Sequence, residues 1–151
     1  MRIGVLSDTH GLLRPEVIDA LSGCDLILHG GDINQQAIID HLSEIAPLRV
    51  VRGNNDKEWA DALPLYLDFF IGSIRVYMTH KKKDLPTDLS PYDLVVIGHS
   101  HKYSETCIGN TIVLNPGSCG PRRFDQAITL AFVESEGRQL RIQKIEILHQ
   151  K

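Results

Sequence analysis

Short apolar runs and stretches of helical spacing alternate along the first third of the chain. Three runs are rich in Ile, Val and Leu and predict buried strands: residues 2–7, 25–28 and 49–51. Residues 14–21 and 34–45 carry apolar side chains at helical spacing, and Asn34 is the expected N-cap of the second helix. This β-α-β-α-β order predicts a parallel sheet with crossover helices.

The remainder of the chain changes to strands separated by short turns. The expected strands are residues 65–70, 73–79, 94–97, 105–108, 111–114, 127–134 and 139–148. Gly109-Asn110 is a strong turn signal between two of them. No repeat, low-complexity segment or linker interrupts the pattern, so residues 1–151 are expected to form a single domain. Antiparallel strands added to a parallel sheet predict an α/β fold of two packed sheets with helices outside.

Composition is that of an ordinary globular protein of 151 residues, with 42% hydrophobic and 23% charged residues. The net charge of -3 does not favour nucleic acid as a partner, because such binding calls for a basic surface. The chain opens on a predicted strand rather than a signal peptide, and no apolar run is long enough to span a membrane. Cys24, Cys107 and Cys119 are odd in number and lack CxxC spacing, which fits a reducing cytoplasm better than disulfides or a zinc knuckle.

Polar blocks follow five of the predicted strands and carry residues that bind metals. The blocks read SDTH, HGGD, RGNND, MTH and GHSH. Their candidate ligands are Asp8, His10, Asp32, Asn54, His80, His99 and His101. A fold that joins these strand ends would gather oxygen ligands and imidazoles at one edge, as a site for two metal ions requires. Mixed imidazole and oxygen ligation suits Mn, Fe, Zn, Ni or Co better than Ca or Mg.

Spacing within the blocks supports this interpretation. Asp8 and His10 lie two residues apart, as do His99 and His101, so in extended backbone the members of each pair face the same way. Two glycines precede Asp32 and allow the backbone to approach an ion closely. Two divalent ions with two carboxylates and one hydroxide leave a site of about +1 charge, which attracts a phosphate group.

The order DTH, GD, GNND, H and GHSH resembles the calcineurin-like metallophosphoesterase superfamily. Within it the chain is similar to the small single-domain branch that contains the YfcE-type phosphodiesterases and the retromer subunit Vps29. The sequence NPGS at residues 115–118, with Pro121-Arg122 close behind, resembles that branch as well. The resemblance runs from about Ile3 to Arg123. It implies a four-layer α-β-β-α sandwich with a dinuclear metal site at the C-terminal ends of the strands.

The resemblance also implies how the ligands divide between two metals. One metal would be held by Asp8, His10, Asp32 and His101. The other would be held by Asp32, Asn54, His80 and His99, so that Asp32 bridges the two. Mn is the expected metal, with Ni, Co, Fe or Zn as alternatives. The implied reaction is phosphoester hydrolysis by in-line attack of a metal-bridging hydroxide, with His10, Asp32 and Asn54 as the candidate catalytic residues.

Two departures from the superfamily pattern bear on catalysis. Many members have a His after GN that assists the leaving group, whereas this chain has Asn55, with Asp56 at the acidic position that follows. An amide cannot donate a proton at neutral pH, so a preference for esters with good leaving groups is expected. His80 is followed by three lysines, residues 81–83, which form either a solvated loop or a rim that attracts phosphate.

Several polar residues near the motifs have two interpretations each. Asn55 and Ser118 are candidate substrate contacts, and Arg122 or Arg123 could either bind a phosphate oxygen or remain a plain surface arginine. His29 either orients a metal ligand or is a strand-end histidine with local hydrogen bonds.

Other histidines, cysteines and aromatic residues are expected to be structural. His41 in the second helix and His149 near the end of the chain are taken as ordinary histidines, and Cys119 as buried filler rather than a nucleophile. The aromatic residues that fit either the core or a subunit interface are Tyr66, Phe69 and Phe70.

The leading hypothesis is a metal-dependent phosphodiesterase for small or nucleotide-like phosphoesters. A phosphomonoesterase would have the same ligand set. A Vps29-like scaffold that binds a partner protein is a third candidate, although all seven ligands are present. A nuclease is a fourth, and the acidic net charge counts against it. The expected partners are a small phosphoester substrate and further copies of the chain in a dimer or tetramer, with no membrane partner.

Overall fold

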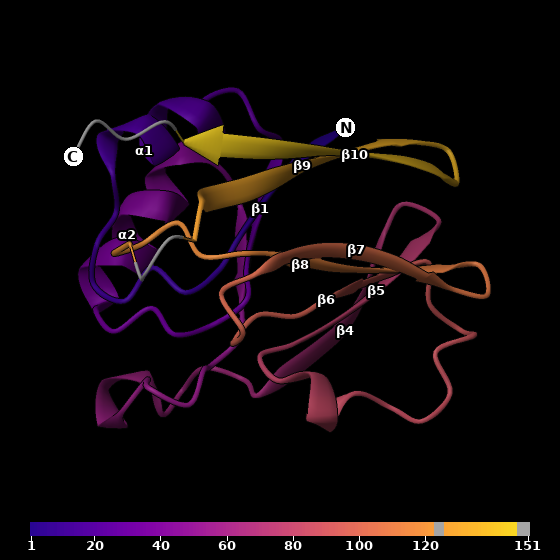
Figure 1. Cartoon of the computed structure of the whole chain (residues 1–151), viewed down its shortest axis with the longest axis horizontal. Coiled ribbons are helices and arrows are strands. Elements are labelled where there is room, and N and C mark those ends of the chain that lie inside the picture. Colours follow the sequence, from indigo (N-terminus) through magenta and orange to yellow (C-terminus); the bar gives the residue numbers. More distant parts are fainter. Residues whose placement is uncertain (123–125, 148–151) are drawn as a thin grey trace.

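Two five-stranded sheets pack face to face in the computed structural model, which describes residues 1–122 and 126–147 (Figure 1). The elements in chain order are β1 (Arg2–Leu6), α1 (Pro15–Leu21), β2 (Leu26–His29), α2 (Gln36–Ile45), β3 (Leu48–Val50), η1 (Glu58–Ala60), β4 (Tyr66–Ile71), β5 (Ile74–Thr79), η2 (Lys82–Asp84), β6 (Leu94–Val96), β7 (Tyr103–Ile108), β8 (Thr111–Pro116), β9 (Ile128–Glu136) and β10 (Gln139–Ile147). The strand positions agree with the apolar runs in the sequence. Residue 148, the expected end of the last strand, lies outside the described residues.

The first sheet has the strand order β10-β9-β1-β2-β3. Strands β1, β2 and β3 run parallel, as the β-α-β-α-β order predicts, while β9 and β10 continue the sheet in antiparallel pairing. Ile3 on β1 lies opposite Leu26 on one side and Val133 on the other. Because β1 is central, the loop that follows it has neighbouring chain on both sides.

The second sheet has the strand order β4-β5-β6-β8-β7. Its three inner strands are parallel, and the hairpins β4–β5 and β7–β8 close its two edges. Gly109 adopts a φ of 60° in the second hairpin, and Ile108 pairs with Thr111 around it. The turn predicted at Gly109-Asn110 is therefore confirmed, and a positive φ explains the glycine.

The core between the sheets is built from alternate residues of the facing strands. Ile3, Val5 and Leu28 contribute from the first sheet, and Met78 and Leu94 from the second. All five are at most 1% exposed. Each such side chain contributes about 1.5–3 kcal/mol through burial, so this layer holds the two sheets, and the loops at their ends, in a fixed relation.

The helices α1 and α2 cover the outer face of the first sheet (Figure 1). Val17, Leu21 and Leu42 from the helices pack with Leu6 and Ile27 of the sheet. These strand residues alternate with those of the inner core, as the period of a strand requires. A sheet with apolar side chains on both faces explains the unbroken apolar runs of β1 and β2.

The outer face of the second sheet is covered by the segment that follows η2. Leu85, Leu89 and Tyr92 of this segment pack with Val95 and Tyr77 of the sheet. The α/β class with two mixed sheets is confirmed, although the fourth layer is the segment that follows η2 rather than an α-helix. Among the described residues, no helix is long and apolar enough to cross a membrane.

The prediction that Asn34 caps the second helix is wrong. The helix α2 begins at Gln36, with Gln35 as the N-cap residue and no side-chain cap hydrogen bond. Asn34 has a φ of 73° and lies one residue before the cap. Its left-handed backbone belongs to the loop that carries Asp32, which overrides the local preference of Asn for a helix cap.

Candidate metal centre

All seven candidate ligands lie in loops that follow strands at one end of the two sheets. Those from the first sheet follow β1, β2 and β3, and those from the second follow β5 and β6. Hydrogen bonds join the loops of the two sheets here: for example, the backbone N–H of His99 donates to Asp8 Oδ2 at 3.1 Å, and His80 Nδ1 lies 2.8 Å from the carbonyl oxygen of Gly30. The loops of both sheets therefore meet at one edge, as the strand order requires.

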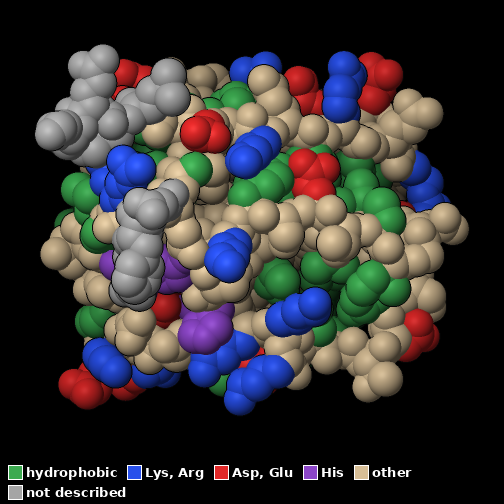
Figure 2. All heavy atoms as spheres, viewed as in Figure 1, with side chains coloured by type: hydrophobic (Ala, Val, Ile, Leu, Met, Phe, Trp, Pro, Cys, Tyr) green, Lys and Arg blue, Asp and Glu red, His purple; other side chains and the backbone are tan. Residues whose placement is uncertain are grey.

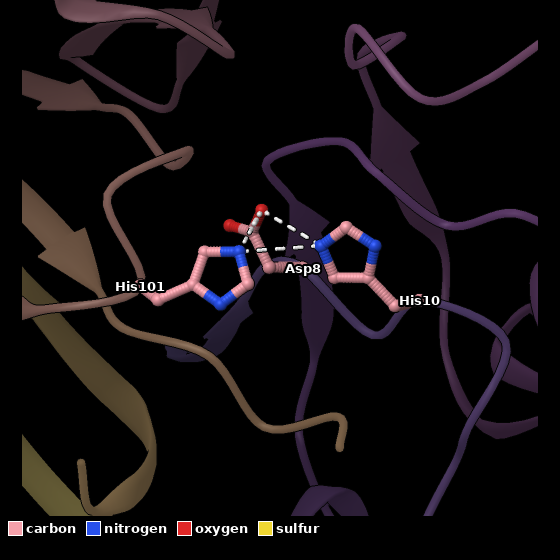
Figure 3. A group of neighbouring side chains, drawn as sticks. All are labelled: Asp8, His10 and His101. Atoms are coloured by element: carbon pink, nitrogen blue, oxygen red, sulfur yellow. Dashed lines mark hydrogen bonds and ion pairs between the residues drawn. The ribbon is translucent and has the colours of Figure 1, made fainter. Parts of the chain in front are cut away.

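Asp8, His10 and His101 form the first group of candidate ligands (Figure 3). Oδ1 of Asp8 lies 3.5 Å from His10 Nε2 and 3.4 Å from His101 Nε2. The two imidazole nitrogens are 3.2 Å apart. Figure 3 shows the carboxylate between the two rings, with both nitrogens turned toward the same oxygen. One ion can therefore reach an atom from each residue.

Asp32, His80 and His99 form the second group. Oδ2 of Asp32 lies 3.2 Å from His80 Nε2. Asn54 joins this group, because its Oδ1 lies 3.1 Å from His99 Nδ1. His10 connects the groups, since its Nε2 lies 3.6 Å from Asp32 Oδ2 as well as close to Asp8. Asp32 thus lies at the boundary between the two groups, where a bridging ligand belongs.

Three buried side-chain atoms have no hydrogen-bond partner among the described residues: Oδ1 of Asp8, Nε2 of His80 and Nδ1 of His101. The first two lie 3.9 Å apart at this boundary. Nδ1 of His80 faces a backbone carbonyl oxygen and can donate to it, which leaves the lone pair on Nε2 pointing into the site. Buried polar atoms in proteins nearly always have partners, so Asp8 Oδ1 and His80 Nε2 fit coordination of a cation.

The carboxylates and imidazoles shift one another's pKa in the directions that favour a cation. Burial alone would raise the pKa of Asp8, but His10, His101, His80 and Ser7 together outweigh it and hold the pKa far below its usual value. At Asp32, burial would also raise the pKa, but His80 contributes to a net lowering. Burial would lower the pKa of His80, yet the two carboxylates raise it. Both carboxylates are therefore ionised, and they attract positive charge to this position.

The backbone of the candidate ligands is held in an uncommon conformation. Positive φ angles occur at Asp8 (57°), His10 (46°), Asp32 (58°), His99 (78°) and His101 (65°). Residues other than glycine seldom adopt such angles, which cost on the order of 1–3 kcal/mol each. Their concentration in the candidate ligands shows that the packed sheets hold these loops against local preference.

Glycines beside the ligands leave no space for a side chain. A Cβ at Gly98 would collide with the Ser7 hydroxyl and lie 2.9 Å from Asp8 Oδ2. A Cβ at Gly53 would collide with the carboxylate and backbone nitrogen of Asp32. The glycines in GHSH and GNND are therefore required for loops of different strands to approach each other at the site.

Asp56 holds two of the ligand loops together, a role that the sequence did not reveal. Its carboxylate accepts hydrogen bonds from the backbone N–H groups of Asp32 (2.9 Å), Ile33 (2.9 Å), Asn34 (2.8 Å) and Gly53 (2.8 Å). It is 2% exposed. The acid after GNN thus fixes the loop of Asp32 against the loop of Asn54. In the sequence, this role is indicated only by the presence of an acidic residue next to the GNN motif.

His29 is a fully buried neutral histidine beneath the site. Its Nδ1 accepts a hydrogen bond of 3.0 Å from the backbone N–H of Gly31, so Nε2 carries the proton and donates to the Thr9 hydroxyl at 3.1 Å. Burial lowers its pKa to about 4. Of the two interpretations, the structure supports the one with local hydrogen bonds, made to the backbone of Gly31 and to the side chain of Thr9.

The candidate substrate contacts lie around this edge. The amide of Asn55 donates to Asp32 Oδ2 at 3.2 Å, and its backbone N–H donates to Asp32 Oδ1 at 2.8 Å. The Ser118 hydroxyl donates to the backbone carbonyl of Asp8 at 3.0 Å, which supports the loop of that ligand. Arg122 is exposed, and Arg123 lies outside the described residues.

Cys119 is completely buried, and burial raises the pKa of its thiol to about 12. It is therefore a packing residue rather than a nucleophile, as the sequence predicts. The three cysteines are free. His41 is exposed on α2, away from the metal motifs, whereas His149 lies outside the described residues.

Tyr66, Phe69 and Phe70 divide between surface and core. Phe69 packs against the inner core, while Tyr66 and Phe70 are 57% and 62% exposed. The core interpretation therefore holds for Phe69 alone. The interface interpretation stays open for the other two.

Comparisons with known proteins bear on the family and the fold of the chain. The family model described as the calcineurin-like phosphoesterase superfamily domain matches residues 1–138. A "probable metallophosphoesterase" of Methanothermobacter thermautotrophicus is 33% identical over 152 aligned residues, which cover 90% of this chain and 88% of that protein. Among solved structures, an archaeal phosphodiesterase superposes with a TM-score of 0.80 at 22% identity, covering 97% of this chain and 100% of the other. Vps29 from Entamoeba histolytica, solved in complex with zinc, gives a TM-score of 0.76 at 20% identity, covering 97% and 99%.

The extent of these matches establishes the class of the protein. The chain belongs to the calcineurin-like phosphoesterase superfamily. Its fold is shared with the small members of that superfamily, including Vps29.

Proposed function

We propose that the protein is a phosphodiesterase that uses two divalent metal ions, with Mn as the preferred metal, to hydrolyse small or nucleotide-like phosphoesters. Asp8, His10, Asp32 and His101 would hold one ion, and Asp32, Asn54, His80 and His99 the other. The observation that carries the proposal is the convergence of two ligand groups on buried Asp8 Oδ1 and His80 Nε2, which have no hydrogen-bond partner among the described residues. Two such ions supply a hydroxide nucleophile and stabilise the charge on the phosphoryl oxygens.

The side chains of the site have separate parts in this proposal. Asp32 lies between the two ligand groups and is held by Asn55 through two hydrogen bonds. His10 faces both carboxylates, at 3.5 Å from Asp8 and 3.6 Å from Asp32, and so is placed to orient the reacting phosphate. Asn55 has no acidic proton to give to the leaving group. The reaction therefore depends on a leaving group that departs readily as an anion.

The alternatives are a phosphomonoesterase and a scaffold that binds a partner protein. The ligand set does not distinguish a diester from a monoester. The Vps29 neighbours share the fold at about 20% identity, which motivates the scaffold alternative. A complete ligand set favours the enzyme, because strained loops and buried charges at this edge cost stability that a scaffold alone does not require.

Hydrolysis of bis(p-nitrophenyl) phosphate by metal-stripped protein, with and without added Mn, tests the proposal. Turnover should depend on Mn and fall by at least about 100-fold in Asp32→Asn, since this variant loses charge at the boundary of both groups. His41→Ala, an exposed histidine on α2, is the matched control and should retain full activity. Absence of turnover with Mn, Ni, Co or Zn would refute the phosphodiesterase. Turnover of p-nitrophenyl phosphate alone would instead assign a monoesterase.

A further inference from the structure

A pocket of about 410 Å³ opens directly beside the candidate metal centre. Asn54 and His80 line it and also belong to the second candidate ligand set. Its other walls come from β4, β5 and the segment that contains η2. Figure 2 shows histidine side chains at the surface of the molecule, with Lys and Arg side chains next to them. A substrate that reaches the metal centre therefore has a second surface on which to rest.

Two stacked tyrosines form part of the wall of this pocket. The rings of Tyr66 and Tyr77 lie 5.5 Å apart at an interplanar angle of 13°. Tyr77 is 8% exposed, and an edge contact at 5.3 Å with Tyr92 supports it from behind. Tyr66 is 57% exposed, and its ring is stacked on the buried ring of Tyr77. An accessible ring on a rigid support is suited to stacking with a flat aromatic group.

The position of Tyr66 relates it to the metal centre. Tyr66 pairs with Thr79, the residue before His80. Phe70 is equally accessible at 62% and lies on the same strand, but it does not line the pocket and instead packs under Arg75, whose guanidinium lies 5.7 Å from its ring. Exposure alone therefore does not distinguish Tyr66 from Phe70. Tyr66 differs because it lines the same pocket as His80.

The charges around the pocket favour an anionic ligand. Arg52, Lys81 and Lys83 line it, against one carboxylate, Asp84. Arg52 is engaged by Asp61 at 3.3 Å. Lys81 and Lys83 make no ion pair with any residue that the structure describes, so their charge is directed at solvent and at the pocket. Cations around a cleft raise the local concentration of anions such as phosphoesters.

We infer that this pocket binds the aromatic arm of a nucleotide-like ester, with its base stacked on Tyr66 and its phosphate beside His80 and Asn54. This inference rests on the proposed phosphodiesterase function and gives its substrate class. A nucleobase supplies the flat ring, and the phosphate supplies the negative charge. Esters without an aromatic group would reach the same metals but would not gain the stacking contact.

Calorimetric titration of the full chain with Mn present, using AMP and ribose 5-phosphate as probes, tests the inference. The two ligands share the sugar and phosphate and differ only in the base. AMP should bind about tenfold more tightly, because stacking of one base is worth about 1–3 kcal/mol. Tyr66→Ala should remove most of that difference, while Tyr66→Phe, which keeps the ring, should preserve it. Phe70→Ala is the matched control and should behave as the wild type.

Equal affinities for the two ligands, or no binding of either, would overturn the inference. The same holds if the preference for AMP survives in Tyr66→Ala. A change of oligomeric state in both Tyr66→Ala and Phe70→Ala, without loss of the preference, would assign Tyr66 to a subunit interface instead. Calorimetry does not require turnover. If the protein hydrolyses bis(p-nitrophenyl) phosphate but shows no preference for AMP, the inference about the pocket fails while the proposed function stands.

Discussion

The carboxylate of Asp56 accepts a hydrogen bond of 2.9 Å from the backbone N–H of Asp32, a residue 24 positions earlier in the chain. This contact fixes a candidate bridging ligand through its backbone rather than through its side chain. Asp56→Ala leaves four backbone N–H groups, three of them buried, without their acceptor, so the free energy of unfolding should fall by about 3–5 kcal/mol. Metal affinity should fall by about 10–100-fold, because the ligand loops lose their fixed relation. Urea denaturation and calorimetric titration with Mn measure the two effects.

Asp61→Ala is the control for this prediction. Asp61 is a largely exposed carboxylate close to Asp56 in sequence, and its side chain forms a surface ion pair with Arg52 at 3.3 Å. Its loss should change the free energy of unfolding by less than about 1 kcal/mol and leave metal affinity unchanged. Similar effects from the two substitutions would show that Asp56 acts only as one more surface charge.

The buried His29 predicts a loss of stability at acidic pH. Its pKa falls from 6.5 in the unfolded chain to about 4 in the fold, because burial penalises the charged ring. The unfolded state therefore binds a proton first as the pH drops. The contribution of His29 is complete above about pH 6.5 and is lost as the pH falls toward 4, by at most about 3 kcal/mol.

The variant His29→Gln separates this effect from other titrating groups. Gln keeps one donor and one acceptor but has no proton to gain in this range. The difference in free energy of unfolding between wild type and variant should shrink between pH 7 and pH 4.5. A difference that stays constant over this range would contradict a buried neutral histidine.

Sequence patterns predicted the sheets well because each strand ends at polar or glycine-containing blocks. The apolar runs match all ten strands to within about two residues, since burial on one or both faces dictates them. Asn34 shows where this reasoning fails. Its neighbours suggest a helix cap, but the loop that carries Asp32 holds it at a φ of 73°.

The candidate ligands were identifiable from the sequence because metals require particular side chains at particular strand ends. The residues that support the ligands and the pocket were not identifiable in the same way. Asp56 binds backbone groups, which carry no sequence signature, and Tyr66 meets Tyr77 only once β4 and β5 pair. Contacts of this kind depend on distances between loops and strands, which are set by the packed fold rather than by local sequence.

Asn55 predicts a steep dependence of rate on the leaving group. Its amide donates to Asp32 Oδ2 at 3.2 Å and offers no acidic proton to a departing oxygen. The logarithm of kcat/KM for a series of aryl phosphodiesters should therefore fall steeply as the pKa of the leaving phenol rises. Asn55→His should flatten the slope by supplying a general acid. A flat dependence in the wild type would contradict the account.

Neighbouring lysines offer a matched test of the cationic rim. Lys83 lines the pocket beside the metal centre, whereas Lys82 is exposed and does not. Lys83→Ala should raise KM for an anionic ester several-fold at low ionic strength, and the effect should shrink as salt screens the charge. Lys82→Ala should leave KM and its salt dependence nearly unchanged. Equal effects from the two lysines would indicate a solvated loop with no directed role.

The central claim is that two ions act together at one edge of the sheets. Its most direct test is a titration of metal-stripped protein with Mn, in which bound metal per chain and hydrolysis of bis(p-nitrophenyl) phosphate are measured on the same samples. Turnover should rise chiefly as the second ion binds, and His80→Ala and His101→Ala should each bind one ion fewer and lose turnover. Full turnover with a single bound ion, or unchanged metal content in both variants, would contradict the dinuclear site.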